Sequence, residues 1–385
     1  MGYWKLVRSL AQNYQFGKYR EFGPPMKLLA FTEGPDHVCY RYRLEAFRLA
    51  LSERGWDLKA EPLARSLFRR VGQLRRAAEA DVVVLQRKLL PLWQLRMLRK
   101  RARRLVYDFD DALYCRDSYH PKGTESWRRM FAFWATIYAA DTVTGGNHHL
   151  CAQAARWVPA ERVRFVPTCI RPETYPVADH RRRGTEVKLV WIGQRSTLPS
   201  LNLAEPCLAA AAARLTGLQL RVVSDVFPNL SGIRVEQRIW SAATEAADVA
   251  DADVGISWLP DDPWSLGKCG LKVLQYMAAG LPVVANPVGA NNQMVVDGVT
   301  GFLVRTPAEC ADAIGRLAAE PELRVRLGRA GRELAGREYG VRRWGEEWAN
   351  LCDELAGRDD ERRSGPNRRA TADSMRRRTF AEAHS

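Results

Sequence analysis

Several features that would assign this 385-residue chain to a membrane, secreted or zinc-binding class are absent from its sequence. No apolar run is long enough to span a bilayer, and no short basic segment followed by an apolar one opens the chain. The eight cysteines are scattered, without a Cys-x-x-Cys pair or a cysteine–histidine cluster at metal-ligand spacing. We therefore expect a cytoplasmic protein whose thiols stay reduced.

Acidic residues are scarce relative to basic ones, 44 against 59, which gives a formal net charge of +15. Residues 87–104 contain no acid, and leucines interleave with their arginines and lysines; a second basic cluster lies within 65–76. Such surfaces attract anionic lipid headgroups, which predicts peripheral binding to the inner face of the plasma membrane; a solvated helix face explains the charge equally well. Nucleic acid is not an expected partner, because no recognised nucleic-acid-binding motif accompanies the charge.

Short apolar runs alternate with helical stretches in two series, separated by a polar break at residues 176–186. This alternation predicts an α/β protein with a parallel sheet in each half. The expected strands are 26–32, 81–86, 104–110, 141–146 and 163–167 in the first half, and 187–193, 218–224, 233–237, 253–259, 282–286 and 301–304 in the second.

The segment 264–304 is the most informative part of the chain. It is expected to form a helix with a polar and an apolar face, then a glycine turn and the short buried strand 281–286. The polar face carries Lys268, Lys272 and Gln275, whose spacing places them on one side of a helix. Lysines beside a helix start and a hydrogen-bonding side chain two turns later suit a phosphate-bearing nucleotide. An ordinary helix–strand unit with surface lysines is the alternative.

These residues resemble the nucleotide-sugar-binding stretch of retaining glycosyltransferases with the GT-B fold, of the group 1 type (glycosyltransferase family 4). That family carries two glutamates separated by seven residues along the helix, whereas this chain has Gly267 and Gln275 at the two positions. The Lys-Cys-Gly entry at 268–270 and the Gln-Tyr-Met at 275–277 are similar to one branch of the family. The resemblance extends from about Met26 to the mid-340s and is strongest in the second half.

The resemblance implies a GT-B architecture, in which two Rossmann-like domains face each other across a cleft. The N-terminal extension is interpreted as a short amphipathic helix or as sequence upstream of a true start at Met26. The expected segments are this extension (1–25), an acceptor domain (26–178), a nucleotide-sugar-binding domain (186–340), a helix crossing back to the first domain (341–356) and a disordered basic tail (357–385).

On the donor side, the resemblance implies that fixed cations hold the nucleoside diphosphate. Ligands of open α/β sheets bind beyond the carboxyl ends of strands, where Gly193 lets the backbone approach and Arg195 can contact a phosphate. Many relatives carry both an arginine and a lysine there, and Lys268 and Lys272 are expected to replace the missing lysine. An arginine solvated after a tight turn is the alternative. The expected donor-binding residues are Gly193, Arg195, Gly267, Lys268, Lys272, Gln275 and Gly289.

On the acceptor side, carboxylates end the expected strand 104–110. Asp110 or Asp111 is expected to orient the acceptor hydroxyl, take its proton or stabilise positive charge on the sugar, although a helix cap explains Asp111 equally well. Tyr40 and Arg41 belong to a loop that commonly lies over the cleft in this fold. Arg41 is predicted to contact phosphate of the donor or of a lipid acceptor, and an ordinary arginine at a helix start is the alternative.

Neither a cofactor nor a metal ion is expected. Asp108-Phe109-Asp110 and Asp251-Ala252-Asp253 have the Asp-x-Asp spelling that holds a divalent ion in the other major glycosyltransferase fold. The first lies far in sequence from the donor segment, and the second precedes its strand, away from the edge where ligands bind. We interpret both matches as accidental, with a metal-dependent glycosyltransferase as the main rival within the class.

The sequence thus predicts an enzyme that transfers a hexose-like sugar from a nucleotide-sugar donor to a glycan or lipid-linked acceptor in cell-envelope polysaccharide or glycolipid synthesis. Retention of configuration and metal independence come from the resemblance alone. A GT-B sugar-nucleotide epimerase is one alternative. A catalytically inactive GT-B scaffold that binds anionic surfaces is another, because Gly267 and Gln275 replace glutamates. A glycogen-type phosphorylase would need a pyridoxal-phosphate lysine and a much longer chain.

Overall fold

The computed structural model describes residues 25–181 and 187–364, and the side chains among them up to Gly357. The expected extension at 1–25, except for its last residue, and the tail beyond Ser364 lie outside the described residues. Within the described ranges no helix is both long and apolar enough to cross a membrane.

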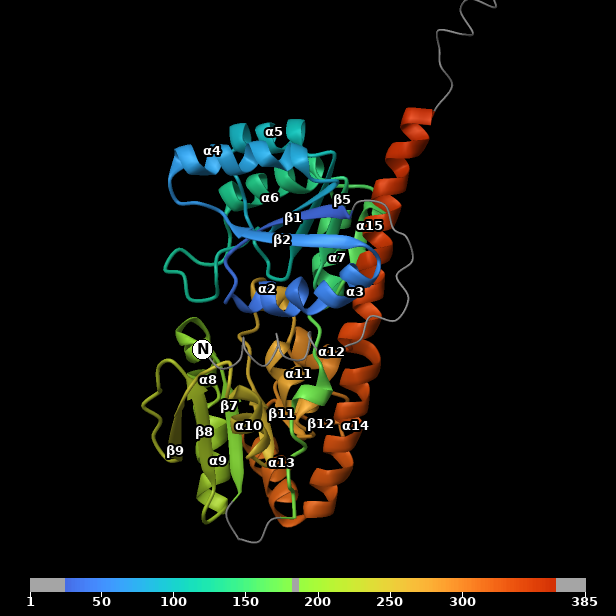
Figure 1. Ribbon diagram of the computed structural model, residues 1–385. Helices are drawn as coiled ribbons and strands as arrows, with labels where there is room; N and C mark the ends of the chain where they lie inside the picture. The colour runs from blue at the N-terminus through green and yellow to red at the C-terminus, as the bar shows by residue number, and fades with distance from the viewer. Residues whose placement is uncertain (1–24, 182–186, 365–385) are drawn as a thin grey trace, which may run out of the picture.

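The first domain is built on a six-stranded parallel sheet in the order β2-β1-β3-β4-β5-β6 (Figure 1). β3 and β4 are buried along their whole length, which explains why the sequence of β3 is a nearly continuous apolar run. The strands are β1 (Met26–Thr32), β2 (Trp56–Pro62), β3 (Val82–Gln86), β4 (Arg104–Phe109), β5 (Thr142–Gly145) and β6 (Val163–Phe165).

Helices cover both faces of this sheet, because successive side chains of each strand point to opposite sides. Leu29 and Val83 pack with one group of helices, and Leu28 and Val82 pack with the other. The first group is α4 (Leu67–Arg75), α5 (Leu92–Arg101), α6 (Trp127–Ala139) and α7 (His148–Ala155); the second is α2 (Val38–Arg43), α3 (Arg48–Glu53) and α15 (Val341–Ser364).

The second domain repeats the arrangement with a parallel sheet in the order β12-β11-β10-β7-β8-β9. The predicted α/β fold with two Rossmann-like domains is therefore confirmed, and the two domains face each other (Figure 1). The elements are β7 (Lys188–Ile192), α8 (Leu198–Leu203), α9 (Glu205–Arg214), β8 (Gln219–Ser224), β9 (Arg234–Ile239), α10 (Glu245–Ala250), β10 (Val254–Ser257), α11 (Leu271–Ala278), β11 (Val283–Ala285), α12 (Ala290–Met294), β12 (Gly301–Leu303), α13 (Pro307–Ala319) and α14 (Pro321–Tyr339).

The last helix, α15, lies on the first domain, where Trp348, Cys352 and Leu355 join its core. The helix does not end at 356 but continues to Ser364, so the disordered tail expected from 357 is wrong over its first eight residues. Once tertiary contacts have anchored a helix, each further turn forms without a new nucleation cost, and residues 356–364 contain no proline to stop it.

The expected helix through Lys268, Lys272 and Gln275 begins later than predicted. α11 starts at Leu271, because its cap Gly270 has a φ of 65°, a left-handed conformation that interrupts the helix. Lys268 instead follows a single 3₁₀ turn, Ser265–Gly267. Of the three polar residues, only Lys272 and Gln275 lie on α11.

Candidate functional site

A cleft of about 630 Å³ lies between the carboxyl edges of the two sheets, where ligands of such sheets bind. Both domains contribute to it. From the first domain it is lined by Cys39, Tyr42, Arg87, Asp110, Asp111, Tyr119 and Arg129, among others, and from the second by Gly193, Arg195, Trp240, Glu245, Lys268, Lys272 and Gln275, among others.

Gly193 and Lys272 are positioned by Trp191, the fully buried tryptophan of β7. A Cβ at Gly193 would lie 2.2 Å from the Trp191 ring, so only glycine allows this close packing beside the cleft. The ammonium of Lys272 lies 5.1 Å from the centre of the same ring. Burial, and then the charge of Lys268, lower the pKa of Lys272 to about 7, although Asp111 acts in the opposite direction. An anionic ligand beside Lys272 would favour its protonated form.

Lys268 crosses the cleft because the turn that carries it packs directly against the first domain. A Cβ at Gly267 would lie 2.5 Å from the backbone nitrogen of Ala112, so no other residue fits there without moving the domains apart. Asn147 donates from Nδ2 to the carbonyls of Leu266 (3.0 Å) and Lys268 (2.9 Å). From this turn Lys268 Nζ reaches Asp111 Oδ1 at 2.8 Å.

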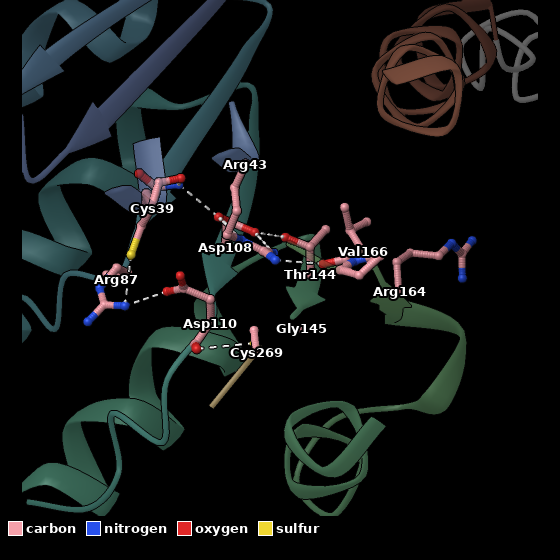
Figure 2. A network of polar contacts seen from close by, with 12 residues as sticks. Cys39, Arg43, Arg87, Asp108, Asp110, Thr144, Gly145, Arg164, Val166 and Cys269 are labelled. Atoms are coloured by element: carbon pink, nitrogen blue, oxygen red, sulfur yellow. Dashed lines mark hydrogen bonds and ion pairs between the residues drawn. The ribbon is translucent and has the colours of Figure 1, made fainter. Parts of the chain in front are cut away.

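Asp110 and Asp111 follow β4 and share one cation, Arg87, at the end of β3 (Figure 2 shows Asp110 and Arg87). The Arg87 Nη atoms lie 2.5 Å from Asp110 and 2.6 Å from Asp111. Arg87 has a φ of 60°, the one non-glycine residue with positive φ in the described ranges, which marks strain beside the cleft. Burial alone would raise the pKa of Asp110, but Arg87 and then Arg43 outweigh it and lower the pKa to about 2. Asp110 is therefore ionised and a weak base.

The two Asp-x-Asp pairs are engaged in structural contacts. Asp108 is fully buried and accepts hydrogen bonds from Arg43, Gln86 and Thr144 (Figure 2). Asp251 accepts from Arg221, and Asp253 from the backbone of Lys188. The parts of the chain that the structure describes contain no cluster of three or more histidine, cysteine or acidic side chains able to hold a metal ion.

Gln275 belongs to a polar cluster that also joins the domains. Its Nε2 lies 3.5 Å from the hydroxyl of Tyr42, which donates to Glu245 Oε1 at 3.0 Å. Arg41 donates to the same oxygen at 3.0 Å, and Trp240 Nε1 donates to Oε2 at 2.9 Å. Arg41 thus pairs with a carboxylate of the second domain, and its predicted phosphate contact stays a prediction.

The structure places three other predicted site residues, Tyr40, Gly289 and Arg195, in different surroundings. Tyr40 is buried away from the cleft, where its hydroxyl donates to Glu45 at 2.5 Å; its place on α2 turns it toward Arg48, so its predicted position over the cleft is wrong. Gly289 does not line the cleft; it supports the Ser265–Gly267 turn, since a Cβ there would lie 2.8 Å from the carbonyl oxygen of Ser265. Arg195 lines the cleft at the start of a 3₁₀ turn.

The sequence reasoning missed Arg87 and Glu245. Arg87 was assigned to the basic surface stretch, although it directly follows an expected strand at the same sheet edge as Asp110, which is the signal that could have identified it. Glu245 had no comparable signal, because its role depends on Arg41 and Tyr42 from the other domain.

Comparisons with known proteins find similarity to glycosyltransferases. The family model of group 1 glycosyl transferases matches residues 176–320. The alpha-D-kanosaminyltransferase of Streptomyces kanamyceticus is 36% identical over 91 residues, 23% of this chain and 23% of that protein. A D-inositol 3-phosphate glycosyltransferase of Acidothermus cellulolyticus is 28% identical over 230 residues, 53% of this chain and 51% of that protein. The chain thus covers about a quarter and about half of these relatives' lengths.

Solved structures share the whole two-domain arrangement. Anabaena HepE in complex with UDP-glucose matches 86% of this chain and 100% of its own at a TM-score of 0.63 and 14% identity. A sucrose-phosphate synthase of Thermosynechococcus elongatus matches 86% of this chain and 99% of its own at a TM-score of 0.63 and 19% identity. At these identities the likeness shows the fold alone.

Proposed function

Because this chain belongs to the group 1 glycosyltransferases of GT-B fold, we propose that it transfers a sugar from a nucleotide-sugar donor to a glycan or lipid-linked acceptor. One observation carries the proposal: Arg195, Lys268 and Lys272 converge on a cleft whose opposite wall presents Asp111. We further propose retention of configuration. The crystallised complex of HepE with UDP-glucose and the family match support a nucleotide-sugar donor.

The cations act on the leaving group. Cleavage of the sugar–phosphate bond builds negative charge on the departing nucleoside diphosphate, which Arg195, Lys268 and Lys272 stabilise together with the N–H groups at the start of α11. The acceptor oxygen attacks the anomeric carbon as the phosphate leaves, and its proton passes to an oxygen of that phosphate. The low pKa of Asp110 favours this route over proton transfer to Asp110.

Asp111 is the proposed contact for the acceptor hydroxyl or the positively charged sugar. Its second carboxylate oxygen is held by Arg87, which keeps the group in one orientation. Asp110 is assigned a positioning role, since it neutralises Arg87 from within the first domain. We propose that the protein serves cell-envelope polysaccharide or glycolipid synthesis as a cytoplasmic enzyme at the membrane surface. The converging cations disfavour an inactive scaffold.

Nucleotide affinity tests the donor site. Lys268→Ala and Arg195→Ala are each expected to weaken UDP or GDP binding about tenfold or more, because hydrogen bonds to charged groups contribute roughly 1.5–3 kcal/mol. Isothermal titration of each variant with UDP or GDP measures the affinity. Arg305→Ala, an exposed arginine of the same domain outside the cleft, should bind like wild type. Wild-type affinity in both cleft variants would remove the proposed site.

Turnover should persist in excess EDTA, because the three cations stand where a divalent ion would otherwise neutralise the diphosphate. The measurement is product formation with and without EDTA, then with added manganese or magnesium. Activity that vanishes with EDTA and returns with either metal would instead favour the metal-dependent alternative.

A further inference from the structure

The basic stretch 87–104 does not form one surface. Arg87 lies in the cleft, Arg99 pairs with Asp141, and buried Arg104 donates to the carbonyl of Leu355. The charge of this stretch that is available to a partner lies on α5, and it joins the exposed cations of the neighbouring helices α4 and α6. We propose that the outer face of these three helices is a docking surface for an anionic lipid bilayer, an inference that deepens the proposed function by naming where a lipid-linked acceptor is met.

Charge of one sign distinguishes this face. The sequences of α4, α5 and α6 contain no aspartate or glutamate. In the part of the chain that the structure describes, none of their exposed cations forms an ion pair with a carboxylate. Anionic headgroups would supply the missing counter-charge. The exposed cations are Arg69, Arg75, Arg96, Lys100, Arg101, Arg128 and Arg129.

An aromatic row runs along the exposed side of α6. Trp127, Phe131, Trp134 and Tyr138 recur every three or four residues, and the exposed fractions of Trp127 and Tyr138 are 77% and 65%. Ring centres are 5.7 Å apart between Phe131 and Trp134, and 5.9 Å apart between Trp134 and Tyr138. The core-facing side of the same helix already buries Phe133. Amphipathic aromatic rings of this kind sit at the headgroup level of membranes.

The apolar surface continues at the starts of the neighbouring helices. Phe68 of α4 is 89% exposed and Trp93 of α5 is 50% exposed. α4 packs on α5 and α5 on α6, so these side chains lie on adjacent helices of the sheet face turned away from the second domain (Figure 1). Large exposed apolar side chains gathered on neighbouring helices are typical of an interaction surface.

The docking face is connected to the cleft. In a parallel sheet each helix starts at the edge where the preceding strand ends, so Phe68, Trp93 and Trp127 lie at the edge that also carries the cleft loops. Arg129, in the first turn of α6, itself lines the cleft. A bilayer held against these helices therefore lies beside the cleft, as a lipid-linked acceptor requires.

Vesicle co-sedimentation of the full chain tests the proposal. Binding is expected to vesicles of phosphatidylglycerol and phosphatidylcholine but not of phosphatidylcholine alone, and to fall at least tenfold between low and high salt. The double variant Phe68→Ser/Trp127→Ala should bind at least tenfold less. The matched control is Ile239→Ser, which removes an 80% exposed apolar residue from the second domain. Unchanged UDP affinity of each variant shows that it is folded.

Three outcomes would overturn the docking surface. The first is no binding to anionic vesicles at low salt, and the second is equal binding by the double variant and wild type. The third is loss of binding when residues 1–24 are deleted while the double variant still binds, which would make that segment the anchor. Vesicle binding without nucleotide binding would instead refute the proposed transferase and leave the docking surface intact.

Discussion

Replacing Gly267 by glutamate, the residue that the resembled family carries there, is expected to lower turnover at least about 100-fold rather than restore a missing catalytic group. A Cβ at this position would lie 2.5 Å from the backbone nitrogen of Ala112, and backbone cannot move aside as a flexible side chain can. The substitution would push the domains apart and withdraw Lys268 from Asp111. Steady-state kinetics of the variant and the wild type measure turnover, and small-angle scattering of both measures the separation of the domains.

The matched control is Gly315→Glu on α13, where a Cβ meets nothing within 4 Å. It should turn over like wild type. Nucleotide affinity of Gly267→Glu should change less than its turnover, because Lys272 and Arg195 belong to the second domain alone. If Gly267→Glu turns over faster than wild type, a glutamate at position 267 restores a catalytic group, and the glycine is not required as an interdomain contact.

Much of the fold could be predicted from sequence, because apolar runs such as Val82–Gln86 are buried on both sides and therefore carry the signal locally. The convergence of Lys272 and Arg195 followed from the rule that ligands bind at the carboxyl edge. The helix containing Lys272 was predicted correctly as an element, but its start was not, because a single left-handed glycine, Gly270, decides it.

Contacts between the domains could not be predicted. Lys268 and Asp111 are 157 residues apart in sequence, and no local pattern specifies their pairing. The same holds for Gly267, whose requirement for glycine comes from Ala112 in the other domain. Tyr40 was misplaced for a related reason: a residue on a short helix faces the cleft or the core depending on packing that its own segment does not encode.

The pairing of Lys268 with Asp111 leads to the second prediction, that Asp111→Asn binds the nucleoside diphosphate more tightly yet turns over more slowly. The Asp111 carboxylate lies 2.8 Å from Lys268 Nζ, where a phosphate oxygen of the donor is proposed to bind. The carboxylate and the phosphate therefore compete for one cation. Removing the charge should raise UDP or GDP affinity about tenfold, or roughly 1.4 kcal/mol. Turnover should fall at least about 100-fold, because the acceptor loses its proposed contact.

Opposite changes in affinity and turnover distinguish this role from a general loss of structure, which would lower both. Asp117→Asn is the matched control, since Asp117 also lines the cleft but accepts a hydrogen bond from the backbone of Tyr119 rather than from a lysine. It should leave nucleotide affinity unchanged. If Asp111→Asn binds nucleotide no more tightly than wild type, Asp111 does not compete with the diphosphate, and Lys268 must reach both groups at once.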